Sequence, residues 1–189
     1  MSQPIPANRY VWFFTVALGG LALDLISKSS VFVDLGYPGE SRWLQTFFGG
    51  WSTFHFQTSI NHGALFGIGQ GWTGLFAALS VVAVAGVLIC LFKYGAAQSL
   101  WLTISLSLIL AGTLGNLYDR LGLHGMLDEN GSPLYGVRDF LLFTFGTYSW
   151  PNFNFADVFL VTGAIMLGLR SLQPEAAPEP KPDVAAGVS

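Results

Sequence analysis

The sequence predicts an all-α integral membrane protein whose helices form a four-helix transmembrane bundle. Of its 189 residues, 52% are hydrophobic and only 10% are charged, whereas a soluble domain carries about 25% charged residues. The mean hydropathy is +0.53. Four apolar stretches, each close to the roughly 20 residues that a helix needs to span the hydrocarbon core, occupy residues 10–26, 72–92, 100–117 and 155–169.

These spans leave little chain for a second domain, so we expect residues 1–172 to form one integral-membrane domain. The first span is as apolar as a cleaved secretory signal, but Asp24 and Lys28 stand at its far end and no small-residue cleavage pattern follows. A retained helix is therefore predicted. Residues 173–189 are rich in Pro, Ala and Glu with little to bury, which predicts a disordered tail.

The connections between the spans differ in length and character. Residues 93–99 alone join the second and third spans, so these two helices are expected to be antiparallel neighbours. The first connection is long and includes residues 53–58, which alternate between polar and apolar side chains as a half-buried β-strand does. Residues 42–48 combine aromatic and polar side chains, which predicts an interfacial segment at headgroup depth.

An even number of crossings brings the polar residues at the span ends to one membrane face. The carboxyl ends of the first and third spans and the amino end of the fourth all reach that face. The residues concerned are Asp24, Lys28, Asn116, Asp119, Arg120, Asn154 and Asp157. Ionisable groups at this depth are costly and usually functional, so their convergence predicts a site.

Local structural roles account for part of this cluster. Asp24 and Lys28 are spaced i,i+4 with the acid first, the favourable order for a helix ion pair, and anchoring of the helix end is an equal alternative to a role in the site. Asn154 and Asp157 fit an N-cap followed by an acid in the first turn. Capping does not account for Asp139, a second acid on the same face, which a loop could fold back toward Asp157.

Asp139 and Asp157 together suit acid-base chemistry. Two neighbouring carboxylates do not both ionise readily, so such a pair retains one proton and can act as base toward water and as acid toward a leaving amine. This is the chemistry of an aspartic protease. The same acids would also serve a proton-coupled membrane transporter or a lipid-binding protein, and a third interpretation treats them as structural caps in an assembly factor.

Other classes of site and partner find little support in the sequence. The net charge of −3 and the lack of any Lys/Arg run exclude nucleic acid as a partner. Cys90 is the one cysteine, and His55, His62 and His124 lack the spacing of zinc ligands. We therefore expect no metal and no cofactor. Incomplete small-residue spacings give no dimer signal, so a monomer is expected.

The count of basic residues is tied between the two membrane faces. Arg9, Lys93, Arg170 and Lys181 lie on the terminal face, and Lys28, Arg42, Arg120 and Arg138 lie on the other. If local carboxylates hold Lys28, Arg120 and Arg138, the remaining basic residues favour cytoplasmic termini.

Five motifs, in order along most of the chain, resemble those of the bacterial lipoprotein signal peptidases, or type II signal peptidases, which are integral-membrane aspartic proteases. The motifs are Asp24-Leu25-Ile26-Ser27-Lys28, Asn61-His62-Gly63-Ala64-Leu65-Phe66-Gly67, Gly115-Asn116-Leu117-Tyr118-Asp119-Arg120, Val137-Arg138-Asp139-Phe140 and Phe153-Asn154-Phe155-Ala156-Asp157. Each motif alone is weak. Their occurrence together at the ends of the expected helices argues against coincidence.

The resemblance implies a substrate, a topology and a set of site residues. Members of this family remove the signal peptide from diacylglyceryl-modified prolipoproteins, cutting just before the lipobox cysteine. Asp139 and Asp157 would be the catalytic pair. The residues that would bind substrate or support the pair are Asp24, Lys28, Asn61, Gly63, Asn116, Asp119, Arg120 and Asn154.

The same resemblance implies four transmembrane helices in the bacterial cytoplasmic (inner) membrane. It implies cytoplasmic termini, an active site toward the outer leaflet, and a small extracytoplasmic β cradle around the lipidated substrate. Membrane lipids would then be partners as well.

The chain departs from the family pattern in two places. Arg138 stands where the family usually has an apolar residue, and residues 121–136 form a longer stretch than usual. The longer stretch makes Asp128 an alternative first acid. Asp128 lies among residues 129–132, which are typical of an exposed turn, so Asp139 is favoured.

Overall fold

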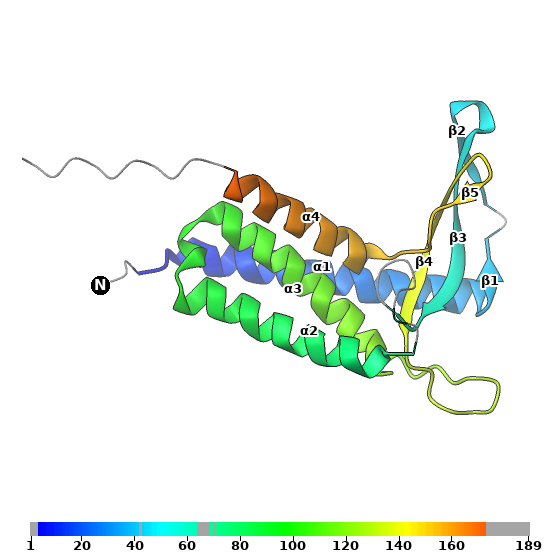
Figure 1. Ribbon diagram of the computed structural model, residues 1–189, viewed down its shortest axis with the longest axis horizontal. Helices are drawn as coiled ribbons and strands as arrows, with labels where there is room; N and C mark the ends of the chain where they lie inside the picture. The colour runs from blue at the N-terminus through cyan, green and yellow to red at the C-terminus, as the bar shows by residue number, and fades with distance from the viewer. Residues whose placement is uncertain (1–3, 42, 64–68, 70, 173–189) are drawn as a thin grey trace, which may run out of the picture.

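The computed structural model describes residues 4–41, 43–63, 69 and 71–172. Its α-helices are α1 (Ala7–Leu35), α2 (Thr73–Leu88), α3 (Leu100–Arg120) and α4 (Phe155–Ser171). Its strands are β1 (Gly39–Glu40), β2 (Gln45–Phe47), β3 (Ser52–Asn61), β4 (Val137–Phe145) and β5 (Tyr148–Ser149). The helices lie alongside one another, and the strands stand at one end of them (Figure 1). The predicted tail, residues 173–189, lies outside the described residues.

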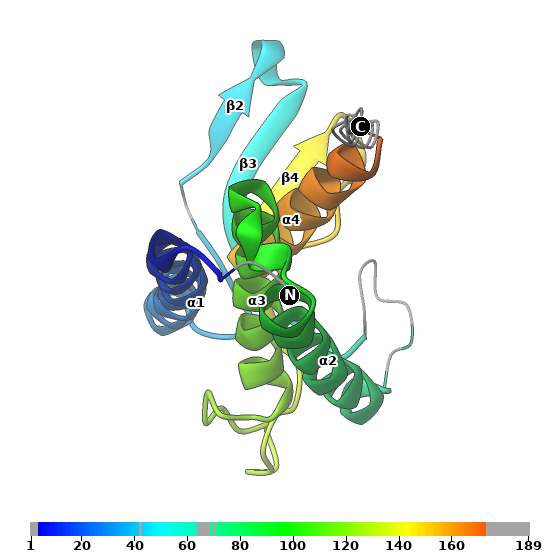
Figure 2. The same ribbon diagram turned by 90° about the vertical axis from the view of Figure 1, so that its left-hand side faces the viewer.

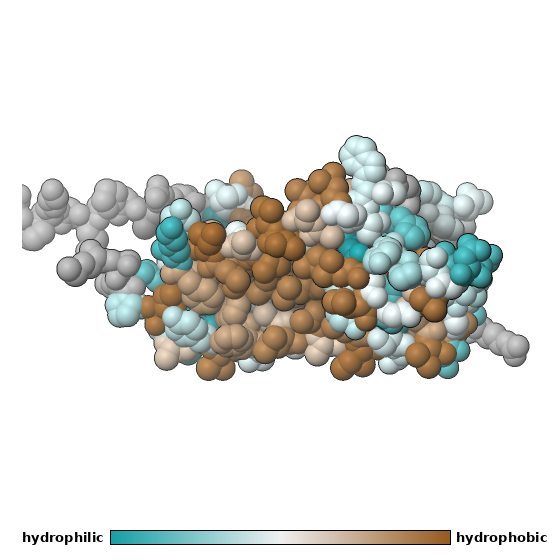
Figure 3. All heavy atoms as spheres, turned by 90° about the horizontal axis from the view of Figure 1, so that it is seen from below, coloured by the Kyte–Doolittle hydropathy of each residue, from teal (hydrophilic) through white to brown (hydrophobic). Residues whose placement is uncertain are grey.

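Three helices in the described part of the chain are long and apolar enough to cross a membrane. They are Ala7–Leu35, Thr73–Lys93 and Leu100–Arg120, the second of which includes the π-helical continuation of α2. The helix α4 has 17 residues, so a fourth crossing stays a prediction. The apolar surface covers the helices and gives way to polar residues at the end that carries the strands (Figure 3).

The helix α3 is the centre of the bundle, since it contacts α1, α2 and α4 and lies between them in the end-on view (Figure 2). The chain reverses between α2 and α3 through Gly95, whose φ of 74° suits glycine. Ser99 then caps α3 by accepting a hydrogen bond from Leu102 N. The two helices are therefore antiparallel neighbours, as predicted.

Glycines allow α3 and α4 to approach closely. A Cβ at Gly163 in α4 would lie 2.7 Å from both Ser105 O and Ile109 Cγ1 of α3, whereas a Cβ at Gly168 would meet nothing within 4 Å. Because Ser105 O and Ile109 N, at 3.2 Å, are backbone atoms, movement of the Ile109 side chain alone would not relieve the clash.

Replacing Gly163 with Ala is expected to destabilise the protein by about 1–3 kcal/mol, because an added methyl group in a packed helix contact forces the backbone to shift. The matched control is Gly168→Ala in the same helix, which should be neutral or stabilising because Ala favours helix over Gly. Thermal unfolding of both variants in the same detergent measures the difference. Equal melting temperatures would contradict the close contact.

The strands form a small antiparallel sheet in the order β1-β3-β4-β5, with β2 also paired to β3. The strand expected at residues 53–58 is present and extends to Ser52–Asn61. The sheet packs on the helices through a buried cluster of Phe32, Ile60, Phe140 and Leu141. The fold is therefore a set of apolar helices with a small antiparallel sheet, and the small β element expected beside the helices is present.

The strand β4 was not predicted, and the loop expected around Asp139 is wrong. Residues 137–142 are all buried, so both faces of β4 are covered there, and residues 140–143 are all apolar instead of alternating with polar residues. A short apolar run of this kind does not differ in pattern from a buried helix. Asp139 is consequently held by strand pairing, opposite Ser59 of β3.

Part of the segment predicted to lie at the interface is β-structure. Gln45–Phe47 form β2 and Phe48–Gly50 form a short 3₁₀ turn, while residue 42 lies outside the described residues. The Trp43 ring packs edge-on against Phe54, with centroids 5.7 Å apart. Trp51 and Phe48 are left exposed.

Candidate active site

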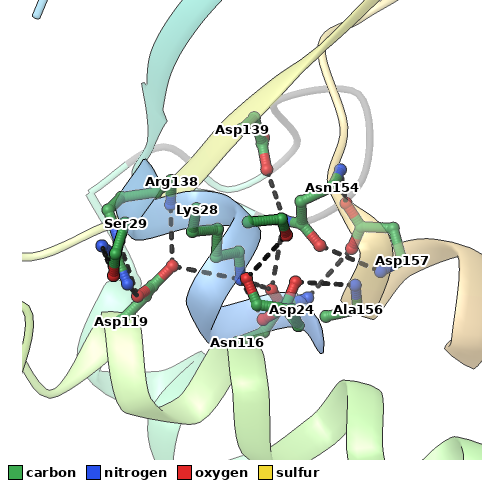
Figure 4. Close-up of polar contacts among 11 residues, drawn as sticks. Asp24, Lys28, Ser29, Asn116, Asp119, Arg138, Asp139, Asn154, Ala156 and Asp157 are labelled. Atoms are coloured by element: carbon green, nitrogen blue, oxygen red, sulfur yellow. Dashed lines mark hydrogen bonds and ion pairs between the residues drawn. The ribbon is translucent and has the colours of Figure 1, made fainter. Parts of the chain in front are cut away.

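The polar residues at the ends of the spans meet where the helices join the sheet (Figure 4). Helix α1 contributes Asp24 and Lys28, and α3 contributes Asn116 and Asp119. Asn154 is the N-cap of α4, Asp157 lies in the first turn of that helix, and β4 contributes Asp139. The cluster is almost closed to solvent, because Asp24, Lys28, Asp119 and Asn154 are all 0% exposed. The structure thus brings together residues from four separate segments of the chain.

Asn154 connects the two candidate catalytic acids. Its Nδ2 donates to Asp139 Oδ1 at 2.6 Å, and its Oδ1 accepts from Asp157 N at 3.0 Å. Its own backbone N donates to Asp157 Oδ2 at 3.2 Å, which completes a capping box at the start of α4. One asparagine therefore caps the helix and fixes both carboxylates relative to each other.

Asp139 is 2% exposed on β4. Burial, and after it the charge of Asp157, raise the pKa of Asp139 well above the ordinary value of a carboxyl group, against hydrogen bonds from Asn154 and Asn61. Because the raised pKa favours the protonated form, Asp139 is suited to donate a proton.

Asn116 joins this pair to the charges behind it. Its Nδ2 donates to Asp157 Oδ1 at 2.9 Å. Its Oδ1 accepts from Asn154 Nδ2 at 3.2 Å and from Lys28 Nζ at 3.1 Å. The amide orientation is fixed by these contacts, since the oxygen faces donors and the nitrogen faces a carboxylate.

Asp24 and Lys28 form the predicted i,i+4 pair, and the pair does more than anchor a helix end. Lys28 Nζ lies 2.7 Å from Asp24 Oδ2 and 3.1 Å from Asp119 Oδ2. Asp24 Oδ1 also accepts a hydrogen bond from Ala156 N at 2.9 Å, in the first turn of α4. Gly115 leaves the space that Asp24 occupies, because a Cβ there would collide with Asp24 Oδ2. The pair thus locks α1 to α3 and to the start of α4.

The remaining motif residues lie at the edge of the cluster. Asn61 Oδ1 accepts from Gly63 N at 2.9 Å, and Arg120 Nη2 donates to Gly63 O at 3.3 Å. The guanidinium of Arg120 stands over the Phe76 ring, 5.6 Å from its centroid. Residues 64–67 of the second motif lie outside the described residues.

Asp128, the alternative first acid, is exposed and held within its own turn. Its Oδ1 accepts from Asn130 N at 2.9 Å and from Ser132 N at 2.8 Å. These bonds are those of an Asx turn. They keep the Asp128 carboxylate within its own loop, and none of its described hydrogen bonds reaches Asp157. The geometry therefore favours Asp139 as the partner of Asp157.

An apolar cavity of about 480 Å³ opens beside Asp157, which forms part of its wall. The other wall residues come from the second half of β4, from the segment between β5 and α4, and from the first turns of α4. They include Phe143, Phe145, Trp150, Phe153, Val158 and Val161. The volume falls within the range of about 300–1,000 Å³ that is usual for ligand pockets.

The sequence did not identify every residue on which this site depends. Ser29 contacts Arg138, Gly115 makes room for Asp24, and the backbone of Ala156 binds Asp24. The contacts of Gly115 and Ala156 have no signal in side-chain chemistry, because one depends on the absence of a side chain and the other on the backbone. The aromatic wall of the cavity was also missed, because the residues that form it are distant in sequence.

Comparison with known proteins places the chain in a family. Residues 16–173 match the family model described as signal peptidase (SPase) II. A lipoprotein signal peptidase from Rhodopirellula baltica is 44% identical over 185 residues, covering 94% of this chain and 79% of the relative. One from Psychromonas ingrahamii is 33% identical over 176 residues, covering 90% of each.

A solved structure described as a bacterial membrane enzyme superposes with a TM-score of 0.68, covering 85% of this chain and 87% of that one. Its sequence identity is 23%, so this likeness supports the fold alone. The family match over most of the chain, together with the two relatives, shows that the protein belongs to the signal peptidase II family of aspartic peptidases.

Proposed function

We propose that this protein is a membrane endopeptidase that removes the signal peptide from diacylglyceryl-modified prolipoproteins, cutting on the amino side of the lipobox cysteine. The observation that carries the proposal is the pairing of Asp139 and Asp157 through Asn154, beside an apolar cavity. Membership of the signal peptidase II family favours this function over the transporter or lipid-binding alternative, which offers no reason for the order of the five motifs.

In the proposed reaction Asp157 is the base and Asp139 is the acid. The Asp157 carboxylate accepts hydrogen bonds from Asn116 Nδ2 and Asn154 N, which stabilise its charged form. It takes a proton from water as the water oxygen bonds to the scissile carbonyl carbon, while protonated Asp139 donates to the carbonyl oxygen. The proton on Asp157 then passes to the leaving nitrogen as the carbon–nitrogen bond breaks, and one hydroxyl of the tetrahedral intermediate returns a proton to Asp139 as the carbonyl re-forms.

The other site residues divide into two groups in this proposal. Asn61, Gly63 and Arg120 lie at the edge of the cluster and would orient the substrate backbone. The residues that support the pair from behind are Asp24, Lys28, Asn116, Asp119 and Asn154.

The cavity beside Asp157 suits an apolar part of the substrate. Its aromatic and aliphatic wall offers few polar partners, as expected for a site that receives acyl chains or the apolar side chains of a signal peptide. Exposed aromatic residues on the sheet, including Trp43, Phe48 and Trp51, would contact lipid at headgroup depth. Membrane lipids are therefore proposed as partners.

The proposed topology has four crossings, with α4 as the fourth, in a single domain of residues 1–172. Both termini would be cytoplasmic, and the site would face the outer leaflet of the bacterial cytoplasmic membrane. The supporting observation is that Lys28, Arg120 and Arg138 all contact protein groups at the site end, so they do not count as free topology signals. The protein is proposed to act as a monomer.

The test is cleavage of a purified, diacylglyceryl-modified prolipoprotein by the purified protein in lipid and detergent. We expect a shorter product on a gel, with a mass that corresponds to a cut immediately before the lipidated cysteine. A substrate with Ser in place of that cysteine is the control and should stay uncut. Absence of product over a range of lipids and pH would reject the proposal. Proton movement across the membrane of vesicles that contain the protein but no prolipoprotein would favour the transporter.

A further inference from the structure

Arg138 is a buried cation next to a candidate catalytic acid. Its side chain is 5% exposed, and a charged group withdrawn from water to this extent is costly unless it is paired and hydrogen-bonded. The proposed mechanism does not yet use this cation.

The side chain of Arg138 points away from Asp139 and toward the helices, because neighbouring residues on a strand face opposite sides. Its Nε and Nη2 lie 3.0 and 2.9 Å from Asp119 Oδ1, and its backbone N donates to Asp119 Oδ2 at 3.0 Å. Its Nη1 donates to Ser29 Oγ at 3.2 Å. The start of β4 is thus bound to α3 and α1 immediately before Asp139 (Figure 4).

The contacts of Asp119 extend this connection to the acid pair. Asp119 Oδ2 lies 3.1 Å from Lys28 Nζ, and Lys28 Nζ donates to Asn116 Oδ1 at 3.1 Å. Asn116 Nδ2 then donates to Asp157 Oδ1 at 2.9 Å. A continuous series of polar contacts therefore leads from Arg138 to Asp157. Arg138 is also the backbone neighbour of Asp139, the other acid.

The formal charges of the supporting group balance only with Arg138. Asp24 and Asp119 carry two negative charges, and Lys28 with Arg138 carries two positive charges. His124 lies near Asp119 and Arg138, and burial lowers the pKa of His124, which keeps it neutral. The other charged groups that surround this set are Arg120, Asp139 and Asp157. Without Arg138, two buried carboxylates would share Lys28 alone.

We propose that Arg138 is a positioning residue of the peptidase reaction. By binding Asp119 it keeps Lys28 on Asn116, and by fixing the start of β4 it holds Asp139 at the correct depth beside Asp157. This inference rests on the proposed function, in which Asp139 and Asp157 are the reacting acids. Arg138 itself touches neither the cavity nor either carboxylate.

The test compares Arg138→Met, Arg138→Lys and Arg138→Met with Asp119→Asn, using the lipidated prolipoprotein. For Arg138→Met we expect kcat to fall by about 10- to 100-fold, the scale of a small misplacement of reacting groups, with KM within about twofold. The acidic limb of its kcat profile should move to higher pH, since the buried set gains a net negative charge. Arg138→Lys should be intermediate, and the double variant should return the pH profile toward that of the unmodified protein.

Arg9→Met, at the far end of α1, is the matched control and should change neither kcat nor the pH profile. The proposal is overturned if Arg138→Met has unchanged kcat and pH profile. It is overturned equally if Arg138→Met fails to fold while Arg138→Lys works at full rate, because the role is then structural. The Asp139→Asn and Asp157→Asn variants separate the two proposals: if both still cleave at the full rate, the proposed function fails whatever Arg138 does.

Discussion

Asp139→Asn and Asp157→Asn are each expected to give a folded protein that cleaves lipidated prolipoprotein about 10²- to 10⁴-fold more slowly, the usual contribution of an acid or base to catalysis. Asn has nearly the shape of Asp and can still accept the bond from Asn154 Nδ2 to position 139 or from Asn116 Nδ2 to position 157. It can neither take a proton from water nor give one to the carbonyl. Initial rates measured under saturating substrate test this.

Asp139→Asn should also change the stability of the protein in a defined direction. The pKa of Asp139 is raised by burial and by Asp157, so the folded state binds more protons than the unfolded state above the ordinary carboxyl pKa. Stability then falls as pH rises through that range. Removing the titrating group should therefore leave the melting temperature at neutral pH equal or higher and flatten its dependence on pH.

Full cleavage by either variant would remove that residue from the mechanism. Asp157→Asn also distinguishes the interpretation of the acids as structural caps, because Asn is itself a good capping residue. If Asp157→Asn preserved activity, the capping role in an assembly factor would be favoured. Loss of activity in Asp157→Ala but not in Asp157→Asn would favour the capping role in the same way.

The sequence predicted which residues would meet at the site better than it predicted the strands around the site. Asp24, Asn116 and Asn154 could be placed on one face because each stands at the end of an apolar span, and span ends are set by the thickness of the bilayer. The bilayer thickness constrains every span in the same way, so the span ends can be located from the sequence without knowledge of the tertiary structure. The antiparallel arrangement of α2 and α3 was also predictable, because the connection between these helices is too short for any other arrangement.

The parts that sequence reasoning missed depend on contacts between distant segments. β4 was hidden because its buried start lacks alternation, so Asp139 was assigned to a loop. Arg138 was recognised only as an unusual residue, and its interaction with Asp119 depends on a strand direction that the pattern did not reveal. The space for Asp24 opposite Gly115 follows from the close approach of α1 and α3, which no local signal specifies.

Lys28→Met is expected to be the most destabilising single change at this site, by about 3–5 kcal/mol, because it removes the cation between two buried carboxylates. Asp24 keeps only the backbone bond from Ala156, and Asp119 keeps Arg138, so the larger cost falls on Asp24. Thermal unfolding in detergent measures the loss, and Lys93→Met at the exposed end of α2 is the control. If Lys28→Met and Lys93→Met melted at the same temperature, Lys28 would not be holding the two acids together. Adding Asp24→Asn to Lys28→Met should recover part of the stability, since it removes the unpaired charge. It should not restore cleavage, because Asn116 would still lack one of the two donors that orient it toward Asp157.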